Sequence, residues 1–303
     1  MVKAKKNLFK KNIPFHLMML PAIVWVIIFG YIPIAGAVIA FQDFKPAMGL
    51  FGAQEFVGLD NFKYILQIPG FWGVIRNTLV IAVSNLILNL AVPIGFALFL
   101  NEVRNSALKR SIQTISYLPH FLSWVILSGI FIDLLSPSNG LLTATLKSLN
   151  ITAPDFLGDP EVFPFTIIVT NVWKNFGYGS IVYLASIGGI DTALYEAAEI
   201  DGAGRFKKMW HITLPGLRPC IVLLMVLSLG GILNAGFDQI FNMYSVQVYS
   251  TGDVLDTLIY RIGLQNGSYS LGTAVGLMKS LVSCTLISVS YYLAYKFTDY
   301  RVF

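Results

Sequence analysis

The sequence predicts an all-α, polytopic membrane protein with six transmembrane helices. Of its 303 residues, 55% are apolar and only 12% are charged, whereas about 25% of the residues of a soluble domain are charged. Six apolar segments also reach the length of about 20 residues that a helix needs to cross the hydrocarbon core of a bilayer. The six predicted spans are approximately 14–41, 77–100, 111–132, 162–190, 219–241 and 271–297.

The distribution of Lys and Arg predicts the orientation of the chain. Five lysines precede the first span, where a basic tail is typical of a topology determinant rather than of a nucleic-acid site. A cytoplasmic N-terminus places 14 of the 21 Lys and Arg residues on the cytoplasmic side, as the positive-inside rule requires. Because the number of spans is even, we expect a multi-pass protein of the cytoplasmic membrane with both termini in the cytoplasm.

The first span and the outer loop after it precede the other five spans. This span is too long for a removed signal peptide and lacks a small-residue cleavage site, so we expect it to be retained. In the loop, segment 57–65 has a turn followed by a periodic apolar pattern, which predicts a short interfacial helix. The predicted divisions are a cytoplasmic basic tail at 1–13, the first span with its extracellular loop at 14–76, one transmembrane domain at 77–297 that includes a cytoplasmic insert at 191–218, and a cytoplasmic tail at 298–303.

The insert between the fourth and fifth spans contains a charged stretch, EAAEIDGAGRFKKMWHITLP, at 196–215. Each of its charges would cost about 3 kcal/mol in hydrocarbon, so the stretch must lie in water. Asp191 and the threonine after it can cap a helix, and Gly202 can take a positive φ that ends this helix. A second short helix is expected through 205–211 before Pro215 stops it. Two amphipathic helices that meet at a glycine suit a groove in another protein.

One spaced motif in the insert is specific. It reads EAA, three residues, Gly, nine residues, Ile, one residue and Leu-Pro, and it resembles the hallmark of permease subunits of binding-protein-dependent ABC importers. The sequence around the motif resembles the carbohydrate-uptake branch of this family. The N-terminal segment FHLMMLPAIVWVIIFGYIPIAGAVIAFQDFKP is similar to that of LplB-type permeases for complex oligosaccharides. The motif positions are Glu196, Ala197, Ala198, Gly202, Ile212, Leu214 and Pro215.

This resemblance implies a type I ABC importer permease fold in a bacterial cytoplasmic membrane and a carbohydrate cargo, an oligosaccharide in particular. It implies that the insert forms coupling helices on an ATPase subunit, that Glu196 pairs there with a basic residue, and that Gly202 makes the bend. The implied partners are a homologous second permease in a heterodimer, two ABC ATPase subunits, an extracellular solute-binding protein and membrane lipid.

The sequence contains no phosphate-binding loop of the form G-x-x-x-x-G-K-[ST]. The segment from Gly276 to Ser280 comes near it but has Met278 in place of the second glycine. ATP and Mg²⁺ are therefore expected on the partner ATPase, with no cofactor on this chain. No catalytic set and no spacing of metal ligands emerges either, so we predict neither an enzyme nor a metal or nucleic-acid site.

Two polar stripes lie within the fourth and fifth predicted spans, where polar groups are costly unless they face a cavity or one another. The first stripe shares one helix face, and the second follows i, i+4, i+8 spacing. Amide and aromatic groups together suit the hydroxyls and apolar faces of sugars; the alternative is hydrogen bonding between helices, at about 0.6 kcal/mol per bond. The candidate pathway residues are Asn171, Trp173, Lys174, Asn175, Tyr178, Asn234, Asp238, Gln239 and Asn242.

Two other function classes compete with the importer subunit. A secondary transporter or channel for a small polar solute, working alone, needs titratable groups at membrane depth, and the sequence offers mainly Lys174, Lys279 and Asp238. A membrane-embedded enzyme needs catalytic groups in register near one interface, and the sequence shows none. Dependence on an ATPase partner separates the importer subunit from both alternatives.

Overall fold

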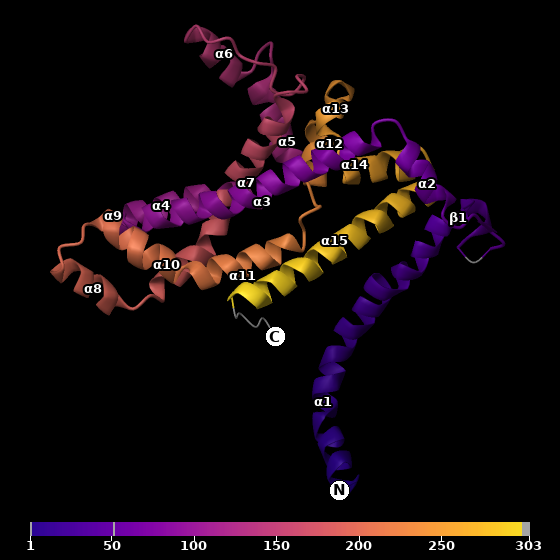
Figure 1. Ribbon diagram of the computed structural model, residues 1–303, viewed down its shortest axis with the longest axis horizontal. Coiled ribbons are helices and arrows are strands. Elements are labelled where there is room, and N and C mark those ends of the chain that lie inside the picture. The colour runs from indigo at the N-terminus through magenta and orange to yellow at the C-terminus, as the bar shows by residue number, and fades with distance from the viewer. Residues whose placement is uncertain (1, 51, 299–303) are drawn as a thin grey trace. The chain divides into compact units, whose positions relative to one another are not determined.

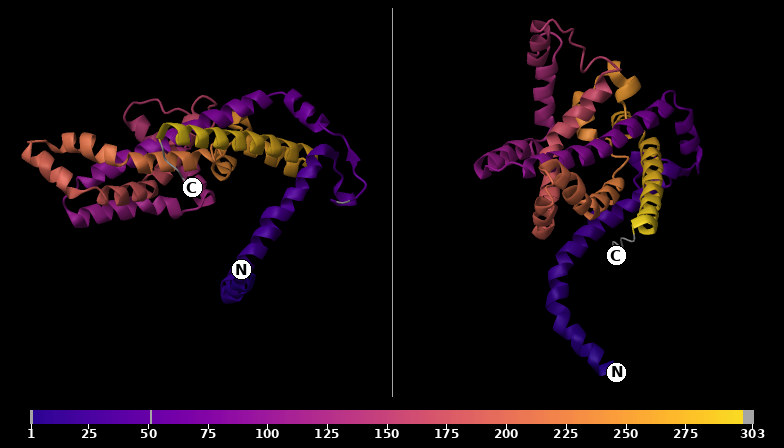
Figure 2. Two further views of the ribbon diagram at one scale, coloured as in Figure 1. Left: turned by 60° about the horizontal axis from the view of Figure 1, so that its bottom comes forward. Right: turned by 60° about the vertical axis from the view of Figure 1, so that its left-hand side comes forward.

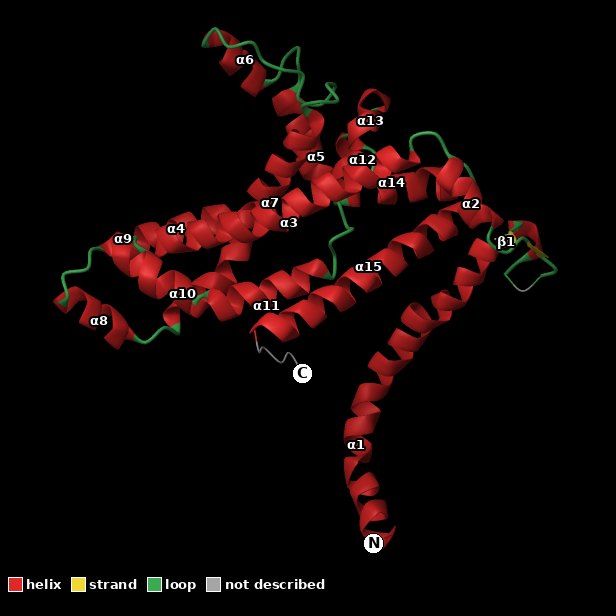
Figure 3. Cartoon of the chain, viewed as in Figure 1, coloured by secondary structure: helices red, strands yellow, loops and turns green. Residues whose placement is uncertain are grey.

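The computed structural model describes residues 2–50 and 52–298, which are almost wholly helical (Figure 3). The chain forms two compact units. The first contains the chain up to Gln67 together with Ile259–Leu277, and the second contains Ile68–Leu258 and the chain from Met278 onward. The predicted tail 298–303 lies outside the described residues except for its first residue.

The first unit contains a continuous helical segment, Asn12–Phe41, which is long and apolar enough to cross a membrane. Its geometry changes to a π turn and then to 3₁₀ helix around Pro33, because proline donates no backbone hydrogen bond and its ring clashes with the preceding turn. The segment matches the first predicted span. The elements of this unit are α1 (Val2–Val26), the π turn Ile27–Tyr31, the 3₁₀ segment Ile32–Phe41, β1 (Gln42–Asp43), the 3₁₀ turn Pro46–Met48, β2 (Glu55–Phe56), α2 (Asp60–Gln67), the π segment Tyr260–Gln265 and the first part of α15 (Tyr269–Thr298).

A small hairpin follows this segment. Strands β1 and β2 pair antiparallel with Gln42 opposite Phe56, and the Asn61 amide donates to the carbonyls of Ala40 at 2.9 Å and Gln42 at 3.1 Å. These bonds tie α2 to the end of the first helical segment. The short helix expected at 57–65 is confirmed, although it begins at Asp60.

The second unit has a core in which α3 packs against α7 (Figure 2). Its buried apolar side chains include Ile81 of α3, Leu127 of α5, Ile167 of α7 and Ile240 of α12. The approach of α7 to the C-terminal part of α4 requires Gly177, because a Cβ there would lie 2.1 Å from the Ser116 carbonyl oxygen. The helices of this unit (Figure 1) are α3 (Phe71–Asn101), α4 (Ser106–Tyr117), α5 (Trp124–Leu135), α6 (Leu141–Ser148), α7 (Phe163–Gly188), α8 (Thr192–Ile200), α9 (Arg205–Lys208), α10 (Leu214–Gly216), α11 (Arg218–Leu229), α12 (Phe237–Met243), α13 (Tyr249–Gly252), α14 (Leu255–Ile259) and the rest of α15.

Among the described residues, three helical segments are long and apolar enough to cross a membrane, or up to five if each of two bent pairs is one span. The straight segments are Asn12–Phe41, Phe71–Asn101 and Tyr269–Val289. Helices α3 and α15 thus match the second and sixth predicted spans. Helix α7 is a single helix of 26 residues, but it is not among these segments, since Asn171, Lys174 and Asn175 lower its mean hydropathy.

The third and fifth predicted spans are wrong as single helices. The chain bends by 103° between Ser106–Phe121 and Trp124–Leu135, where Ser123 accepts from the backbone of Ile126 and starts a new helix. In the fifth span, α11 ends at Leu229, and α12 begins only after Gly236, which has a φ of +93°. Glycine allows the left-handed conformation from which α12 starts, because it has no Cβ.

Candidate functional site

The charged insert folds into the expected helix pair. The Asp191 carboxylate accepts from the Ala193 amide at 2.9 Å and caps α8. Gly202 has a φ of +73° and directs the chain into α9. The second helix, however, does not stop before Pro215: it continues through a π turn, Met209–Thr213, and ends at Gly216. The wider π turn accommodates the ring of Pro215. The π turn Ile27–Tyr31 precedes Pro33 of the first span in the same way.

Three side-chain contacts hold the insert together. The hydroxyls of Tyr195 and Thr213 lie 2.9 Å apart and join α8 to the second helix. Lys208 Nζ lies 3.1 Å from Glu199 Oε2, which links the two helices again. The Arg205 guanidinium lies 3.9 Å from the Glu102 carboxylate that follows α3. These contacts make the insert a braced projection rather than a free loop.

The motif residues divide into an outer and an inner set. Glu196 and Ala197 are exposed on α8, a helix with no buried residue. Ile212, Leu214 and Pro215 are half-buried and lead into Leu217, which is fully buried against the core. The structure therefore assigns anchoring to the second half of the motif and leaves the first half available to a partner.

Large apolar side chains elsewhere on the insert are also exposed. Ile200 is 88% exposed and Phe206 is 72% exposed, and the Phe206 ring stacks on Trp210 with centroids 6.5 Å apart. Helix α8 lies at the far end of the second unit from α13 (Figure 1). Large exposed apolar side chains on a charged insert are typical of a surface that another protein covers. The sequence motif alone does not include Ile200, Phe206 or Trp210.

A second feature is a cavity of about 300 Å³ inside the second unit. Four asparagines line it: Asn85 and Asn89 from α3, Asn171 from α7, and Asn234 from the break between α11 and α12. The Asn89 amide nitrogen donates to Asn171 Oδ1 at 3.0 Å. The side-chain oxygens of Asn85 and Asn89 are buried and accept no hydrogen bond from any described residue. Unsatisfied acceptors of this kind call for an explanation, and a functional role is one.

Two of the nine predicted pathway residues, Asn171 and Asn234, line this cavity. Asn85 and Asn89, which the pathway prediction omitted, line it too; their i, i+4 spacing at membrane depth was the available signal. Asn171 also donates to Gln239 Oε1 at 3.0 Å. Gln239 itself is fully buried and donates to the Ile167 carbonyl at 2.8 Å, so it bonds α12 to α7 rather than lining the cavity.

The other predicted pathway residues on α7 make packing contacts. Lys174 is buried with its ammonium 4.6 Å from the centre of the Trp124 ring. Asn175 is hydrogen-bonded to His120 at 3.0 Å, and His120 stacks on Tyr178 at 3.9 Å between centroids. Trp173 packs edge-on against a core phenylalanine of α5. These contacts correspond to the alternative of interhelical bonding.

The second polar stripe is not continuous. Asn234 lies in the break at 230–236, whereas Asp238 and Asn242 lie on α12. Asn242 donates back to the Asp238 carbonyl at 2.6 Å, one turn earlier. The i, i+4, i+8 spacing therefore does not place the three residues on one helix face, because it does so only where a single helix contains them.

Comparisons with known proteins agree with these features. Residues 89–295 match the family described as "binding-protein-dependent transport system inner membrane component". Protein LplB of Bacillus subtilis (strain 168) is 41% identical over 95% of this chain and 90% of its own length. The polygalacturonan/rhamnogalacturonan transport system permease protein YteP of the same organism is 38% identical over 95% of this chain and 89% of its own length.

A solved structure has the same fold. A chain of a bacterial ABC transporter involved in the import of the acidic polysaccharide alginate superposes with a TM-score of 0.89, at 37% identity, over 98% of this chain and 99% of that chain. The resemblance that the EAA motif indicated is thereby confirmed, and so are the ABC permease fold and the assignment as a transport component rather than an enzyme. The chain belongs to the family of inner membrane components of binding-protein-dependent transport systems.

Proposed function

We propose that this chain is a permease subunit of an ATP-driven importer that moves an oligosaccharide across the bacterial cytoplasmic membrane by alternating access. The cavity lined by Asn85, Asn89, Asn171 and Asn234 is the observation that carries the proposal. It combines several amides with apolar walls, which is the mixture that binds hydroxylated ligands. Its volume of about 300 Å³ lies at the small end for ligand pockets, so it suits a short stretch of a sugar chain. A polygalacturonan/rhamnogalacturonan permease and an alginate importer among the relatives support a carbohydrate.

The proposal includes six spans. They are the three straight segments, the bent pair of Ser106–Phe121 and Trp124–Leu135, helix α7, which carries the cavity residue Asn171, and the interrupted segment from α11 to α12. An even number of spans and the basic N-terminal tail favour cytoplasmic termini. The insert at 191–218 then lies in the cytoplasm, and α6 lies outside.

Cysteine labelling tests this topology. In a chain whose two native cysteines, Cys220 and Cys284, are replaced by alanine, Ser148→Cys on α6 is expected to react with a membrane-impermeant maleimide in intact cells. Asp201→Cys on the insert is expected to react only after permeabilisation, because the membrane shields the cytoplasmic side. Labelling of Asp201→Cys in intact cells would contradict the proposed orientation.

We assign the exposed half of the motif to an ABC ATPase subunit. Glu196 would pair with a basic residue of the ATPase. The exposed side chains of Ile200, Phe206 and Trp210 would be buried against the ATPase surface. Two such ATPases would carry ATP and Mg²⁺. A homologous second permease and an extracellular solute-binding protein complete the proposed complex; a periplasmic protein that carries alginate pentasaccharide accompanies a related transporter.

Energy from ATP would reach the cavity through the braced insert. Closure of the ATPase pair would displace α8 and α9, and the contact between Arg205 and Glu102 would pass that displacement to the end of α3, the helix that carries two cavity asparagines. The bend at 122–123 and the break at 230–236 are the places where spans can change angle without loss of regular helix.

Import of defined oligosaccharides tests the proposed cargo. The complete complex in proteoliposomes is offered labelled fragments of two to five residues from alginate, polygalacturonate and rhamnogalacturonan. Import of at least one of them is expected, and it should depend on the binding protein. A complex that imports none of these fragments but carries an amino acid or a peptide would contradict the proposal.

A further inference from the structure

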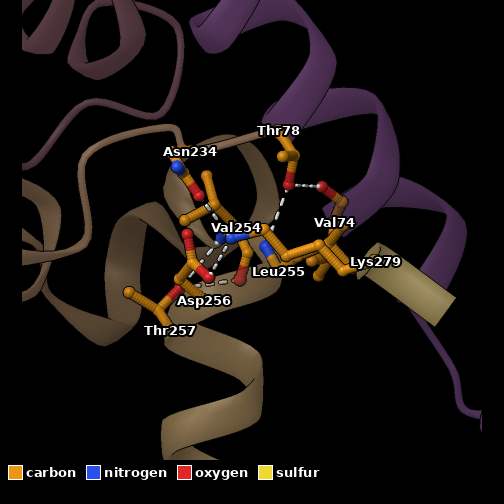
Figure 4. Close-up of polar contacts among 8 residues, drawn as sticks. All are labelled: Val74, Thr78, Asn234, Val254, Leu255, Asp256, Thr257 and Lys279. Atoms are coloured by element: carbon orange, nitrogen blue, oxygen red, sulfur yellow. Dashed lines mark hydrogen bonds and ion pairs between the residues drawn. The ribbon is translucent and has the colours of Figure 1, made fainter. Parts of the chain in front are cut away.

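A half-buried charged pair lies beside the cavity. Lys279 of α15 places its ammonium 2.5 Å from Asp256 Oδ1 of α14 and 2.8 Å from Asn234 Oδ1 (Figure 4). The side chains of Lys279 and Asp256 are only 15% and 21% exposed. Neither residue lines the cavity, but Asn234 does. Lys279 therefore contacts the cavity wall through one asparagine.

The chemistry of lysine decides which way the Asn234 amide faces. An ammonium group has three donors and no acceptor, so Asn234 must present its oxygen to Lys279. The amide nitrogen, with its two donors, then lies on the opposite side. The position of Gly231 supports this orientation. Gly231 lines the cavity, and a Cβ placed on it would lie 3.5 Å from Asn234 Nδ2. Lys279 thus directs the donors of Asn234 toward the cavity side.

Asp256 completes the arrangement by holding the ammonium and balancing its charge. A buried lysine without a partner would be costly, and it would also attract anions to the wall indiscriminately. The segment before Asp256 is itself anchored: the Leu255 amide donates to Thr78 Oγ1 at 2.9 Å, and Thr78 donates to the Val74 carbonyl at 2.7 Å (Figure 4). The carboxylate is therefore fixed relative to α3, the helix that carries Asn85 and Asn89.

We propose that Lys279 is a positioning residue for the cargo, which acts by turning the Asn234 amide so that its NH₂ group faces the cavity. The cavity, which Asn85 and Asn89 also line, then offers the amide donors of Asn234 to sugar hydroxyls, since each hydroxyl both donates and accepts. This inference rests on the proposed function, because it assumes that the cargo occupies this cavity.

A pair of neutral substitutions separates positioning from charge balance. Lys279→Met alone leaves the half-buried Asp256 without its partner, so the informative variant is Lys279→Met with Asp256→Asn. It is compared with the wild type in proteoliposomes that contain the whole complex. The probe is the alginate, polygalacturonate or rhamnogalacturonan fragment that the wild type imports fastest. Sugar imported and ATP hydrolysed are measured together.

The double variant is expected to retain ATP hydrolysis stimulated by the loaded binding protein but to import about tenfold less sugar per ATP, because one directed hydrogen bond to the cargo is lost. Adding Asn234→Ala should cause no further loss, since the two changes act through the same amide. Lys279→Arg keeps donors and charge and should recover most of the import. A merely structural role would lower hydrolysis and import in parallel.

Normal import per ATP in the double variant would overturn the proposal, because Lys279 would then serve only to neutralise Asp256. A further loss on adding Asn234→Ala would overturn it too, since the two residues would then act independently. Failure of the wild-type complex to import any of the three probes contradicts the proposed function itself, so the two failures are distinguishable in one experiment.

Discussion

Replacing Glu196 by lysine is expected to abolish import while the chain still reaches the membrane. Glu196 is exposed on a helix with no buried residue, so the substitution removes no internal contact. At the proposed interface it would bring like charges together, which costs several kcal/mol and corresponds to a loss of more than about 100-fold in affinity for the ATPase. Co-purification of the ATPase with the tagged chain and import in proteoliposomes measure the effect.

A matched control is available elsewhere on the chain. Glu161 is also an exposed acid, but it precedes α7 and lies far from the insert in sequence. Glu161→Lys makes the same change of charge and should leave co-purification of the ATPase unchanged. Equal loss in both variants would indicate a general effect of charge, and normal import by Glu196→Lys would refute the coupling role.

Replacing Asn85 by leucine is expected to stabilise the chain and to impair import. The Asn85 side-chain oxygen is buried without a partner, a situation that costs about 1–3 kcal/mol. Leucine removes this cost and also narrows the cavity that Asn85 lines. We therefore expect a higher Tm for the purified chain and a fall in import of at least about tenfold, as is common when a functional polar group is replaced.

Ser84→Ala is the control for this variant. Ser84 precedes Asn85 on the same helix and is not among the cavity-lining residues. Its substitution should leave import unchanged. If Asn85→Leu lowers the Tm, the amide takes part in packing; if it leaves import intact, the cavity is not the cargo pathway.

The sequence predicts most strongly those elements that depend on one dominant force. Burial of a long apolar run in hydrocarbon is such a force, so the helices at 71–101 and 269–298 match their predicted spans. The cap at Asp191 and the positive φ of Gly202 are equally local, and both are confirmed. The division of the chain at 13, 76 and 297 remains a prediction.

The breaks in the third and fifth spans were not predictable from hydropathy. Pro119 and Ser123 indicate a helix boundary only if the chain can turn at their depth in the membrane. Tertiary contacts, which the sequence does not show, decide whether such a turn is tolerated. Gly230, Gly231 and Gly236 are ordinary residues in membrane helices, so their presence does not reveal that the chain leaves helical geometry for seven residues, 230–236.

The cavity asparagines illustrate a further limit. Asn171 and Asn175 lie on the same predicted face, yet Asn171 lines the cavity and Asn175 bonds to His120. Helical spacing gives the direction of a side chain but not the neighbour it meets. The partner of Lys279 could not be found from sequence either, because Asp256 lies 23 residues away on a separate short helix.

The central claim is that this permease couples ATP hydrolysis on partner subunits to import through its own insert. The most direct test is import of a labelled oligosaccharide into proteoliposomes that contain the complete complex, with ATP and Mg²⁺ present or absent on the ATPase side. We predict import that requires ATP and the loaded binding protein and that is lost in Glu196→Lys. Import by this chain alone, without ATP or partners, would contradict the account and favour a stand-alone transporter or channel.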